Sequence, residues 1–341
     1  MKKFCITGGG TGGHLAIAKT IAKTTQDMNI ETIFIGSESG QDRDYFQDSP
    51  LFKEKYFLKT SGVVNKKGIK KIFSLLNIFK AFLHVRKILK EQNIDLVFSV
   101  GGFSAAPASF AALSLGIPLV IHEQNAYTGT LNRILKKYAT VFFSSYDKDS
   151  PIKDYPVDDI FFDMSRIRKT IKTVIFLGGS QGARYINELA IELAPLLQEK
   201  NIHIIHQTGK NEYNKIKTSY QKLGINAEVY GFTDKLPQLM HKADLAISRS
   251  GASTLWELTA NALPALFIPY PYAANDHQYH NARFLEEKGV VWIQKQTQDP
   301  KNKLLEILDN NLEEKSKTLQ SMLKKDGARK MIQYLQTKVL S

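Results

Sequence analysis

Residues 4–14 read FCITGGGTGGH, and residues 174–184 read VIFLGGSQGAR. In each stretch an apolar run that suits a buried strand leads into a glycine-rich loop, and a helical pattern follows. Backbone N–H groups in such a loop and at a helix N-terminus bind anions, and the helix dipole favours the negative charge. Two such loops, half a chain apart, predict two phosphate-handling halves that face each other.

Apolar strand-like runs alternate with helical segments around both loops. This alternation predicts an α/β protein with two doubly wound parallel sheets. Residues 147–172 are charged and lack a clear period, so we expect a domain linker there, and a lysine-rich helical segment over 312–340. The expected strands are 4–7, 32–35, 96–100, 119–122 and 141–144 in the first half, and 174–177, 202–207, 227–230, 245–248 and 265–269 in the second.

Length, charge and composition narrow the class of protein. A chain of 341 residues fits two domains better than one. The single cysteine, Cys5, excludes an internal disulfide and is expected to be a buried strand residue. The net charge of +13 indicates an anionic partner, which could be nucleic acid, an anionic membrane or a phosphorylated substrate. The sequence has no zinc-ligand spacing and no nucleic-acid signature, so we expect no metal and no nucleic acid.

One uncharged stretch of the sequence resembles a membrane-spanning segment. No formal charge occurs between Asp95 and Glu123. A spanning helix needs about 20 mostly apolar residues in one element, whereas this window is interrupted by glycines and prolines. Buried parallel strands also read as continuous apolar runs. We therefore expect a strand, a helix over 105–115 and a second strand.

The first loop satisfies G-x-G-x-x-G through Gly8, Gly10 and Gly13. Alone, this is weak support for a dinucleotide site, because the acidic residue expected at the end of the second strand is present only as Glu38, beyond that end. A tight turn that requires positive φ is the structural alternative. His14 lies just inside the expected helix and is a candidate for a ligand cleft, although a packed or surface histidine stays open.

Four further polar segments follow expected buried strands. Ligands of doubly wound sheets bind beyond the carboxyl ends of the strands, so these segments are candidate site residues. Simple capping is the structural alternative, in particular for Ser253 and Thr254 as N-caps and for Glu257 as a helix-dipole partner. The segments are 101–104, 122–125, 250–257 and 275–278.

Over its whole length the chain resembles the MurG family of peptidoglycan glycosyltransferases. These enzymes move N-acetylglucosamine from its UDP conjugate to a muramyl-pentapeptide on undecaprenyl diphosphate. The resemblance implies a GT-B fold, in which two Rossmann-like domains have a cleft with the active site between them. It rests on GGGTGGH (8–14), GG-x-SAAP (101–107), GIP-x-V-x-HEQN (116–125), GGSQGAR (178–184), SRSGAST-x-x-E (248–257), LPALFIPYP (263–271) and HQ-x-x-NA (277–282).

The resemblance also implies domain roles. Residues 1–160 would form the acceptor and membrane-associating domain, 161–320 the UDP-sugar domain, and 321–341 a helix that could pack back on the first domain. The implied chemistry is inverting and needs neither metal nor cofactor. The implied location is the cytoplasmic face of the bacterial inner membrane, as a peripheral protein beside other cell-wall synthesis proteins, in a process that sets cell shape and division.

Individual residues are implied by motif. His14 is the candidate base and Glu123 the second candidate. Thr11, Gly12 and Gly13 would face the acceptor diphosphate and the reacting centre beside the bound donor. On the donor side the resemblance implies Ser180, Ala252, Ser253 and Thr254 at the UDP diphosphate, Glu257 at the ribose, Phe232 and Thr233 at uracil, and Gln278 and Asn125 at the sugar.

The sequence departs from the family pattern at the linker and in one loop. The family has an arginine after Asn-Pro-Val, near the nucleotide, whereas Tyr155-Pro156-Val157 is followed here by Asp158. Arg166 or Arg168 could take that arginine's place. Phe103 replaces a common tyrosine, so no hydroxyl acts at that position.

Residues 66–90 are both apolar and basic. Ile72, Leu76, Phe79 and Leu83 form a stripe at helical spacing. The stripe could be the core face of an amphipathic helix with solvated lysines, or a patch that inserts into an anionic membrane surface. The implied lipid-linked acceptor favours the membrane. The predicted patch consists of Lys70, Lys71, Ile72, Phe73, Leu75, Leu76, Ile78 and Phe79.

Other functions stay open at this point. A different GT-B glycolipid transferase would share the donor half, and a UDP-N-acetylglucosamine epimerase would need no lipid. A nicotinamide-dependent oxidoreductase would rest on the first loop alone. A non-catalytic nucleotide-sugar binding protein at the membrane would bind UDP without turnover.

Overall fold

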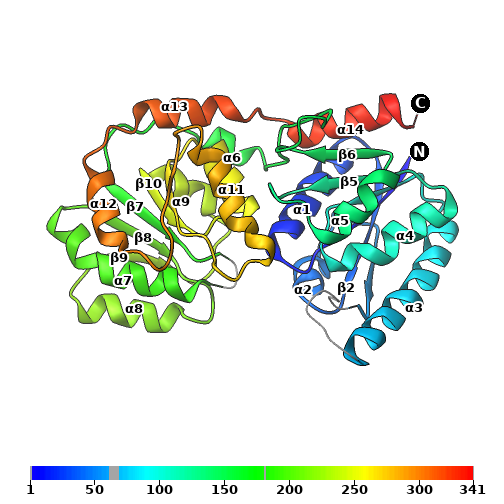
Figure 1. Ribbon diagram of the computed structural model, residues 1–341, viewed down its shortest axis with the longest axis horizontal. Coiled ribbons are helices and arrows are strands. Elements are labelled where there is room, and N and C mark those ends of the chain that lie inside the picture. Colours follow the sequence, from blue (N-terminus) through cyan, green and yellow to red (C-terminus); the bar gives the residue numbers. More distant parts are fainter. Residues whose placement is uncertain (1, 61–68, 180–181, 341) are drawn as a thin grey trace. The chain divides into compact units, whose positions relative to one another are not determined.

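The structure is a computed structural model that describes residues 2–60, 69–179 and 182–340, with the side chains of 69–73 and 75 outside the description. The chain divides into two compact units. Unit 1 comprises Met1–Pro156 together with Asp326–Ser341, and unit 2 comprises Val157–Lys325. Each unit contains a six-stranded parallel sheet with helices on both faces (Figure 1). The prediction of an α/β fold with two doubly wound sheets is confirmed.

The sheet of unit 1 is built from apolar strands that are buried on both faces, except for the half-buried edge strand β3. Its order is β3-β2-β1-β4-β5-β6, so the first and fourth strands are central neighbours. Cys5 lies in the first strand and is fully buried, as expected. The strands are β1 (Lys3–Thr7), β2 (Glu31–Ser37), β3 (Glu54–Leu58), β4 (Leu96–Ser99), β5 (Leu119–Glu123) and β6 (Val141–Ser144).

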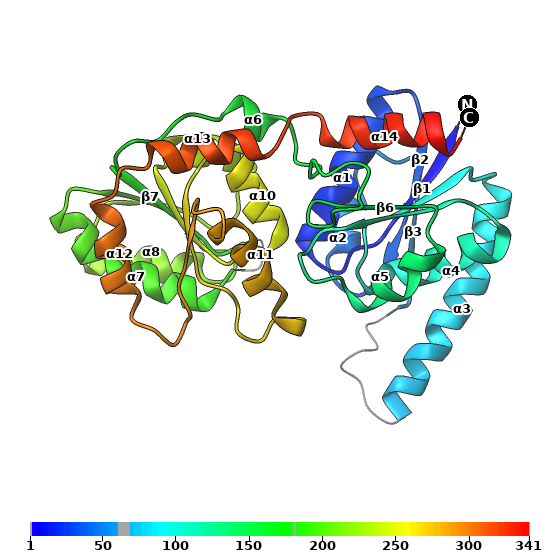
Figure 2. The same ribbon diagram turned by 45° about the horizontal axis from the view of Figure 1, so that its top comes forward.

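Helices cover both faces of this sheet. On one face Val85, Ala111 and Leu135, from three different helices, join a core with the strands. On the other face the last helix of the chain lies beside the first (Figure 2). Tyr334 of this last helix meets Phe143 of β6 edge-on. The helices are α1 (Gly12–Asp27), α2 (Asp42–Phe46), α3 (Ile69–Glu91), η1 (Phe103–Ala105), α4 (Ala106–Leu115), α5 (Thr130–Leu135), η2 (Lys136–Tyr138) and α14 (Gly327–Lys338).

Unit 2 repeats the strand arrangement of unit 1. Its order is β12-β11-β10-β7-β8-β9, which is again third, second, first, fourth, fifth, sixth when read from β9. This is the strand order of the Rossmann fold. The strands are β7 (Thr173–Leu177), β8 (His203–Gln207), β9 (Ala227–Tyr230), β10 (Leu245–Ser248), β11 (Ala265–Phe267) and β12 (Trp292–Ile293).

The helices of unit 2 also form two layers. Leu193, Ile216 and Ile307 come from three different helices and share one core with the strands. The helices are α6 (Ile160–Asp163), α7 (Arg184–Glu199), α8 (Tyr213–Lys222), α9 (Leu236–Lys242), α10 (Ala252–Ala260), η3 (Ala274–Asp276), α11 (His277–Glu286), α12 (Pro300–Leu308) and α13 (Glu313–Met322).

The expected lysine-rich helical segment over 312–340 is helical and consists of two helices. Leu323 is extended after α13, and Asp326 adopts a left-handed φ of 66° before α14. The break lets α13 stay in unit 2 while α14 belongs to unit 1. The window between Asp95 and Glu123 forms strand, helix and strand, as predicted. In the part of the chain that the structure describes, no helix is long and apolar enough to cross a membrane.

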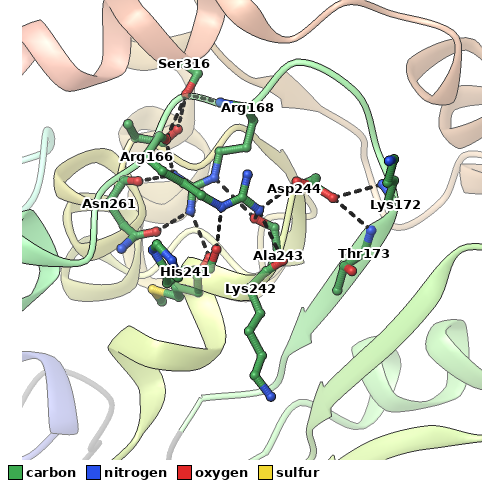
Figure 3. Close-up of polar contacts among 12 residues, drawn as sticks. Arg166, Arg168, Lys172, Thr173, His241, Lys242, Ala243, Asp244, Asn261 and Ser316 are labelled. Atoms are coloured by element: carbon green, nitrogen blue, oxygen red, sulfur yellow. Dashed lines mark hydrogen bonds and ion pairs between the residues drawn. The ribbon is translucent and has the colours of Figure 1, made fainter.

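Two arginines from the expected linker are bound inside unit 2 (Figure 3). The Arg166 guanidinium donates to the His241 carbonyl at 2.6 Å and to Asp244 at 2.7 Å. The fully buried Arg168 donates to the Met240 carbonyl at 2.9 Å and to Oδ1 of Asn261 at 2.6 Å. The last carbonyls of a helix lack intrahelical donors, and a cation there also interacts favourably with the dipole. The two side chains therefore cap the C-terminal end of α9.

Burial lowers the pKa of Arg168 to about 9, and the positive charge of Arg166 adds to this effect. The surrounding carbonyl oxygens accept from the guanidinium, which stays charged at neutral pH. The hydrogen bonds of both guanidinium groups described above are made to α9 and its surroundings. That Arg166 or Arg168 takes the place of the family arginine stays a prediction.

Candidate functional site

Each sheet places two loops side by side at the carboxyl ends of its two central strands. In unit 1 these are the loops after β1 and β4, which begin at Gly8 and at Val100. In unit 2 they follow β7 and β10, and begin at Gly178 and Arg249. These points, where the strand order reverses, are where ligands of doubly wound sheets bind. Both glycine-rich loops of the sequence therefore lie at a crevice position.

The glycines of the first loop are required by packing between two loops. The Gly9 N–H donates to the Gly101 carbonyl at 3.1 Å. A Cβ on Gly8, whose φ is +116°, would lie 2.3 Å from the Gly101 oxygen, and a Cβ on Gly102 would lie 2.1 Å from the Gly9 oxygen. Close backbone contact thus explains these glycines without a ligand. The candidate position for an anion at this loop is the N-terminus of α1, which begins at Gly12.

His14 lies in the first turn of α1 with its ring held at both nitrogens. Thr11 Oγ1 lies 2.9 Å from Nδ1, and Gln124 Nε2 lies 2.9 Å from Nε2. Thr11 is exposed and Gln124 is buried, so the partner of Nδ1 lies nearer to solvent than the partner of Nε2. The ring also lies close to His122, since burial and the charge of His14 lower the pKa of His122 to about 3. The histidine is positioned at the loop by specific polar contacts.

Glu123 accepts hydrogen bonds from several nitrogen atoms of the loop that follows β5. Its carboxylate binds the Asn125 and Gly129 N–H groups, each at 2.9 Å, and Asn132 Nδ2 at 2.9 Å. Its side chain is almost fully buried. These contacts fix the loop between β5 and α5, and with it the backbone of Asn125. The carboxylate therefore has a structural task in this loop.

The second glycine loop packs against the end of β8. The Gly178 N–H donates to the Gln207 carbonyl at 2.9 Å, and Gln207 Nε2 donates to the Gly179 carbonyl at 2.9 Å. A Cβ on Gly182, at φ +80°, would lie 2.5 Å from the Thr208 oxygen. These contacts hold both ends of the loop. Ser180, the predicted diphosphate contact of this loop, lies outside the described residues.

The N-terminus of α10 is a second candidate anion site in unit 2. Gly251 is its N-cap, and a Cβ there would meet nothing within 4 Å. Ala252, which is buried, and the half-buried Ser253 and Thr254 form the first turn. Glu257 follows one turn later; burial and, second, the negative charge of Asp158 raise its pKa to about 7. In this chain a second carboxylate thus lies near Glu257 where the family has an arginine.

Hydrogen bonds join the start of α11 to the loop before α10. Ser250 Oγ donates to the Gln278 carbonyl at 2.8 Å, and Asn281 Nδ2 donates to the Ser250 carbonyl at 3.2 Å. The Gln278 side chain accepts from the Tyr270 N–H at 3.0 Å. The structure therefore brings the predicted Gln278 to the same crevice as the predicted Ser253 and Thr254, through contacts that the sequence motifs did not specify.

The predicted uracil contacts lie in the turn after β9. The Phe232 side chain is 57% exposed, and the Lys210 ammonium lies 5.2 Å from its ring centroid. Thr233 Oγ1 accepts from the Lys235 N–H at 3.0 Å. The exposed ring is available for stacking, whereas the threonine hydroxyl stabilises its own turn.

Arg249 is a residue of this crevice that motif reasoning did not single out. Its guanidinium lies 5.3 Å from the Tyr185 ring and 5.5 Å from the Tyr270 ring, and it donates to the Ile268 carbonyl at 2.9 Å. It therefore supports the loop that carries Tyr270. A charged residue directly after a buried strand was the available signal. Within the described residues no group of three or more His, Cys, Asp or Glu side chains could hold a metal ion.

Comparisons with known proteins agree with this division. Residues 4–144 match the glycosyltransferase family 28 N-terminal domain, and residues 173–335 match the C-terminal domain of that family. A relative from Sulfurimonas denitrificans is 55% identical over 330 residues, which are 97% of each chain. It is named UDP-N-acetylglucosamine--N-acetylmuramyl-(pentapeptide) pyrophosphoryl-undecaprenol N-acetylglucosamine transferase.

Solved structures with the same fold include two that are informative. The crystal structure of Acinetobacter baumannii MurG has a TM-score of 0.80 at 26% identity, covering 99% of this chain and 100% of that chain. A UDP-GlcNAc 2-epimerase from Neisseria meningitidis bound to UDP-GlcNAc has a TM-score of 0.63 at 14% identity, with coverage of 99% and 100%. The second similarity shows the fold alone.

Proposed function

The chain belongs to glycosyltransferase family 28, and on that premise we propose that it transfers N-acetylglucosamine from UDP-N-acetylglucosamine to the muramyl-pentapeptide on undecaprenyl diphosphate, with inversion at the anomeric carbon. The observation that carries the proposal is the 55% identity, over 97% of both chains, to a transferase of that name. The two crevices described above supply one position for the donor and one for the acceptor.

The donor would bind to unit 2. The N-terminus of α10, with Ser253 and Thr254, would hold the UDP diphosphate, and Glu257 would accept from the ribose hydroxyls. Negative charge develops on the diphosphate as the sugar leaves, and fixed N–H donors at a helix N-terminus stabilise that charge. Phe232 would contact uracil, and Gln278 the sugar.

The acceptor would bind to unit 1, with its diphosphate at the N-terminus of α1 and its hydroxyl at His14. As a base, His14 must offer a lone pair to the hydroxyl proton. This atom would be Nδ1, on the side of the exposed Thr11, and it would be unprotonated when the Gln124 amide turns so that its oxygen accepts from Nε2–H. The saturated hydrogen bonding of Glu123 favours His14 over Glu123 as the base and gives Glu123 the task of placing Asn125.

A transfer assay tests the proposal directly. Radiolabelled UDP-N-acetylglucosamine and a synthetic prenyl-diphosphate muramyl-pentapeptide are incubated with the protein, with and without a chelator. We expect label in the prenyl-linked product under both conditions. Epimerised UDP-sugar in the absence of acceptor would contradict the proposal and identify an epimerase, and UDP binding without any turnover would identify a binding protein.

The raised pKa of Glu257 predicts opposite effects of one substitution on stability and on binding. The carboxyl ionises near pH 4.5 in the unfolded chain and near pH 7 in the folded protein, so the free energy of unfolding falls as pH rises between these values. We expect Glu257→Gln to raise the midpoint of urea unfolding at pH 8, with a gain that shrinks toward pH 5. We also expect it to weaken UDP binding about tenfold, since a charged acceptor is lost.

Glu287→Gln is the matched control, because Glu287 pairs with Arg283 on the surface of the same unit. It should change neither quantity. If Glu257→Gln is no more stable than wild type at pH 8, then burial of the ionised Glu257 carboxylate does not destabilise the folded protein.

We further propose that α3 attaches unit 1 to the cytoplasmic face of an anionic membrane. Leu76, Phe79 and Leu83 are 49%, 58% and 51% exposed, so the interpretation of this stripe as a core face was wrong for these residues. The core face of α3 is formed instead by Ala81, Val85, Ile88 and Leu89. Ile78 is half-buried, and the side chains of Lys70, Lys71, Ile72, Phe73 and Leu75 lie outside the description.

Serine substitutions test this attachment. We expect Leu76→Ser and Phe79→Ser each to lower the partition coefficient onto phosphatidylglycerol vesicles about tenfold, because burying such a side chain is worth about 1.5–3 kcal/mol. Leu223→Ser serves as the control, since Leu223 is 45% exposed but lies in unit 2. Co-sedimentation measures the bound fraction. Equal partitioning of all three variants with wild type would exclude α3 as the attachment site.

A further inference from the structure

A carboxylate that the mechanism above does not use lies directly behind the first glycine loop. Asp42, the first residue of α2, is fully buried. Its Oδ1 accepts from the Gly10 N–H at 2.5 Å, and its Oδ2 accepts from the Ser37 N–H at 2.8 Å. One side chain thus joins the loop after β1 to the end of β2.

The surrounding backbone is shaped to admit this carboxylate. A Cβ on Gly9 would lie 2.5 Å from Asp42 Oδ1, and a Cβ on Gly36 would lie 2.9 Å from Asp42 Oδ2. The buried hydroxyl of Ser104, in η1, lies near the carboxylate and favours its ionised form, although it does not reach hydrogen-bond geometry. Three segments that are distant in sequence therefore converge on Asp42.

We propose that Asp42 is a positioning residue for the acceptor, because its carboxylate fixes the glycine loop from which the N-terminus of α1 presents Thr11 and His14 to the acceptor diphosphate. This inference rests on the proposed function. The Asp42 carboxylate accepts the hydrogen bond of the Gly10 N–H. This N–H group is therefore not free to donate to an anionic ligand. The acceptor's anion is thereby directed to the helix N-terminus beyond Gly10.

The burial of Asp42 makes its replacement informative. Burial is the main influence on its carboxyl and raises its pKa, while the two backbone N–H donors oppose this effect. Asparagine has the same shape, but its amide group carries one oxygen acceptor and one NH2 donor. It can therefore accept from only one of Gly10 and Ser37, and it meets the other N–H with a donor. The loop would lose its fixed position while the apolar packing of α2 stays unchanged.

The experiment compares Asp42→Asn with Asp44→Asn, an exposed aspartate on the same helix. Steady-state transfer is measured with a short-chain prenyl-diphosphate muramyl-pentapeptide, and the concentration of active protein is set by UDP titration. For Asp42→Asn we expect at least a tenfold loss in kcat/KM for the acceptor, carried mainly by KM, with the Kd for UDP within twofold of wild type. For Asp44→Asn we expect both constants within twofold.

Ser104→Ala is the second variant. It removes the hydroxyl that lies near the Asp42 carboxylate, but it breaks no hydrogen bond of normal geometry. We expect about a threefold loss in kcat/KM for the acceptor and an unchanged Kd for UDP, and this result decides the matter if Asp42→Asn does not fold. Two results would overturn the proposal. One is a wild-type kcat/KM for the acceptor in the folded variants, and the other is a loss of UDP affinity as large as the loss in kcat/KM. If wild type itself fails to use the acceptor, the proposed function fails instead.

Discussion

Replacement of His14 by alanine is expected to lower kcat by about 10² to 10⁴, because general base catalysis contributes a factor of that size. The Kd for UDP should stay within twofold of wild type, since the contacts proposed above for the uridine and the diphosphate belong to unit 2. The measurement pairs steady-state transfer with UDP titration monitored by tryptophan fluorescence. Both tryptophans, Trp256 and Trp292, lie in unit 2 and report on the donor side.

A histidine outside the crevices gives the control. His203 pairs with Glu228 at 3.0 Å on the partly exposed edge of unit 2, and His203→Ala should leave kcat unchanged. Turnover of His14→Ala at the wild-type rate would remove His14 from the chemistry. In that case Glu123 would return as the candidate base, despite the backbone contacts that occupy its carboxylate.

Arg168→Met is expected to destabilise unit 2 by about 3–5 kcal/mol, which is the usual cost of removing one partner from a buried charged network. Methionine fills similar space but donates nothing, so the carbonyls of Met240 and Ala243 and the side chain of Asn261 would lose their buried donor. Urea unfolding followed by tryptophan fluorescence measures this unit alone, because both tryptophans belong to it.

Arg283→Ala is the comparison variant, since Arg283 forms an exposed ion pair with Glu287. Exposed pairs contribute about 0–1 kcal/mol, so its unfolding midpoint should move little. If Arg168→Met and Arg283→Ala cost the same, then Arg168 does not contribute the buried cap that its contacts describe.

The sequence predicted ten strands and missed β3 and β12. The central strand β10 and the edge strands β6 and β9 are bounded at the residues that the apolar runs indicated. The edge strands β3 and β12 were not predicted, because β3 begins with Glu54 and Lys55 and β12 has only two residues, so neither gives a clear apolar run. The glycine-rich turns that follow the central strands were predicted. Close backbone contacts require glycine at these turns, so the glycines are visible in the sequence.

Only those candidate site residues that belong to sequence motifs could be predicted. Motifs identify which residues lie near strand ends, so His14, Ser253 and Gln278 could be named as candidates, and their roles stay predictions. The roles of Asp42, Arg168 and Arg249 depend on partners far away in sequence. Asp42 contacts a loop 32 residues before it and Arg168 contacts a helix 72 residues after it. Apart from the position of Arg249 directly after a buried strand, nothing local in the chain distinguishes these residues from surface charges, which is why composition and spacing could not identify them.

The membership of α14 in unit 1 has a consequence for how the chain folds during synthesis. Residues 157–325 of unit 2 are contiguous, whereas unit 1 is completed only by the last residues of the chain. Lys330 pairs with Asp154 at 2.7 Å, and Lys2 Nζ donates to the Leu340 carbonyl at 2.9 Å, so both ends of the chain meet in the same unit. Domains generally fold as units while the ribosome elongates the chain. The face of α1 against which α14 packs therefore stays uncovered until α14 has been translated.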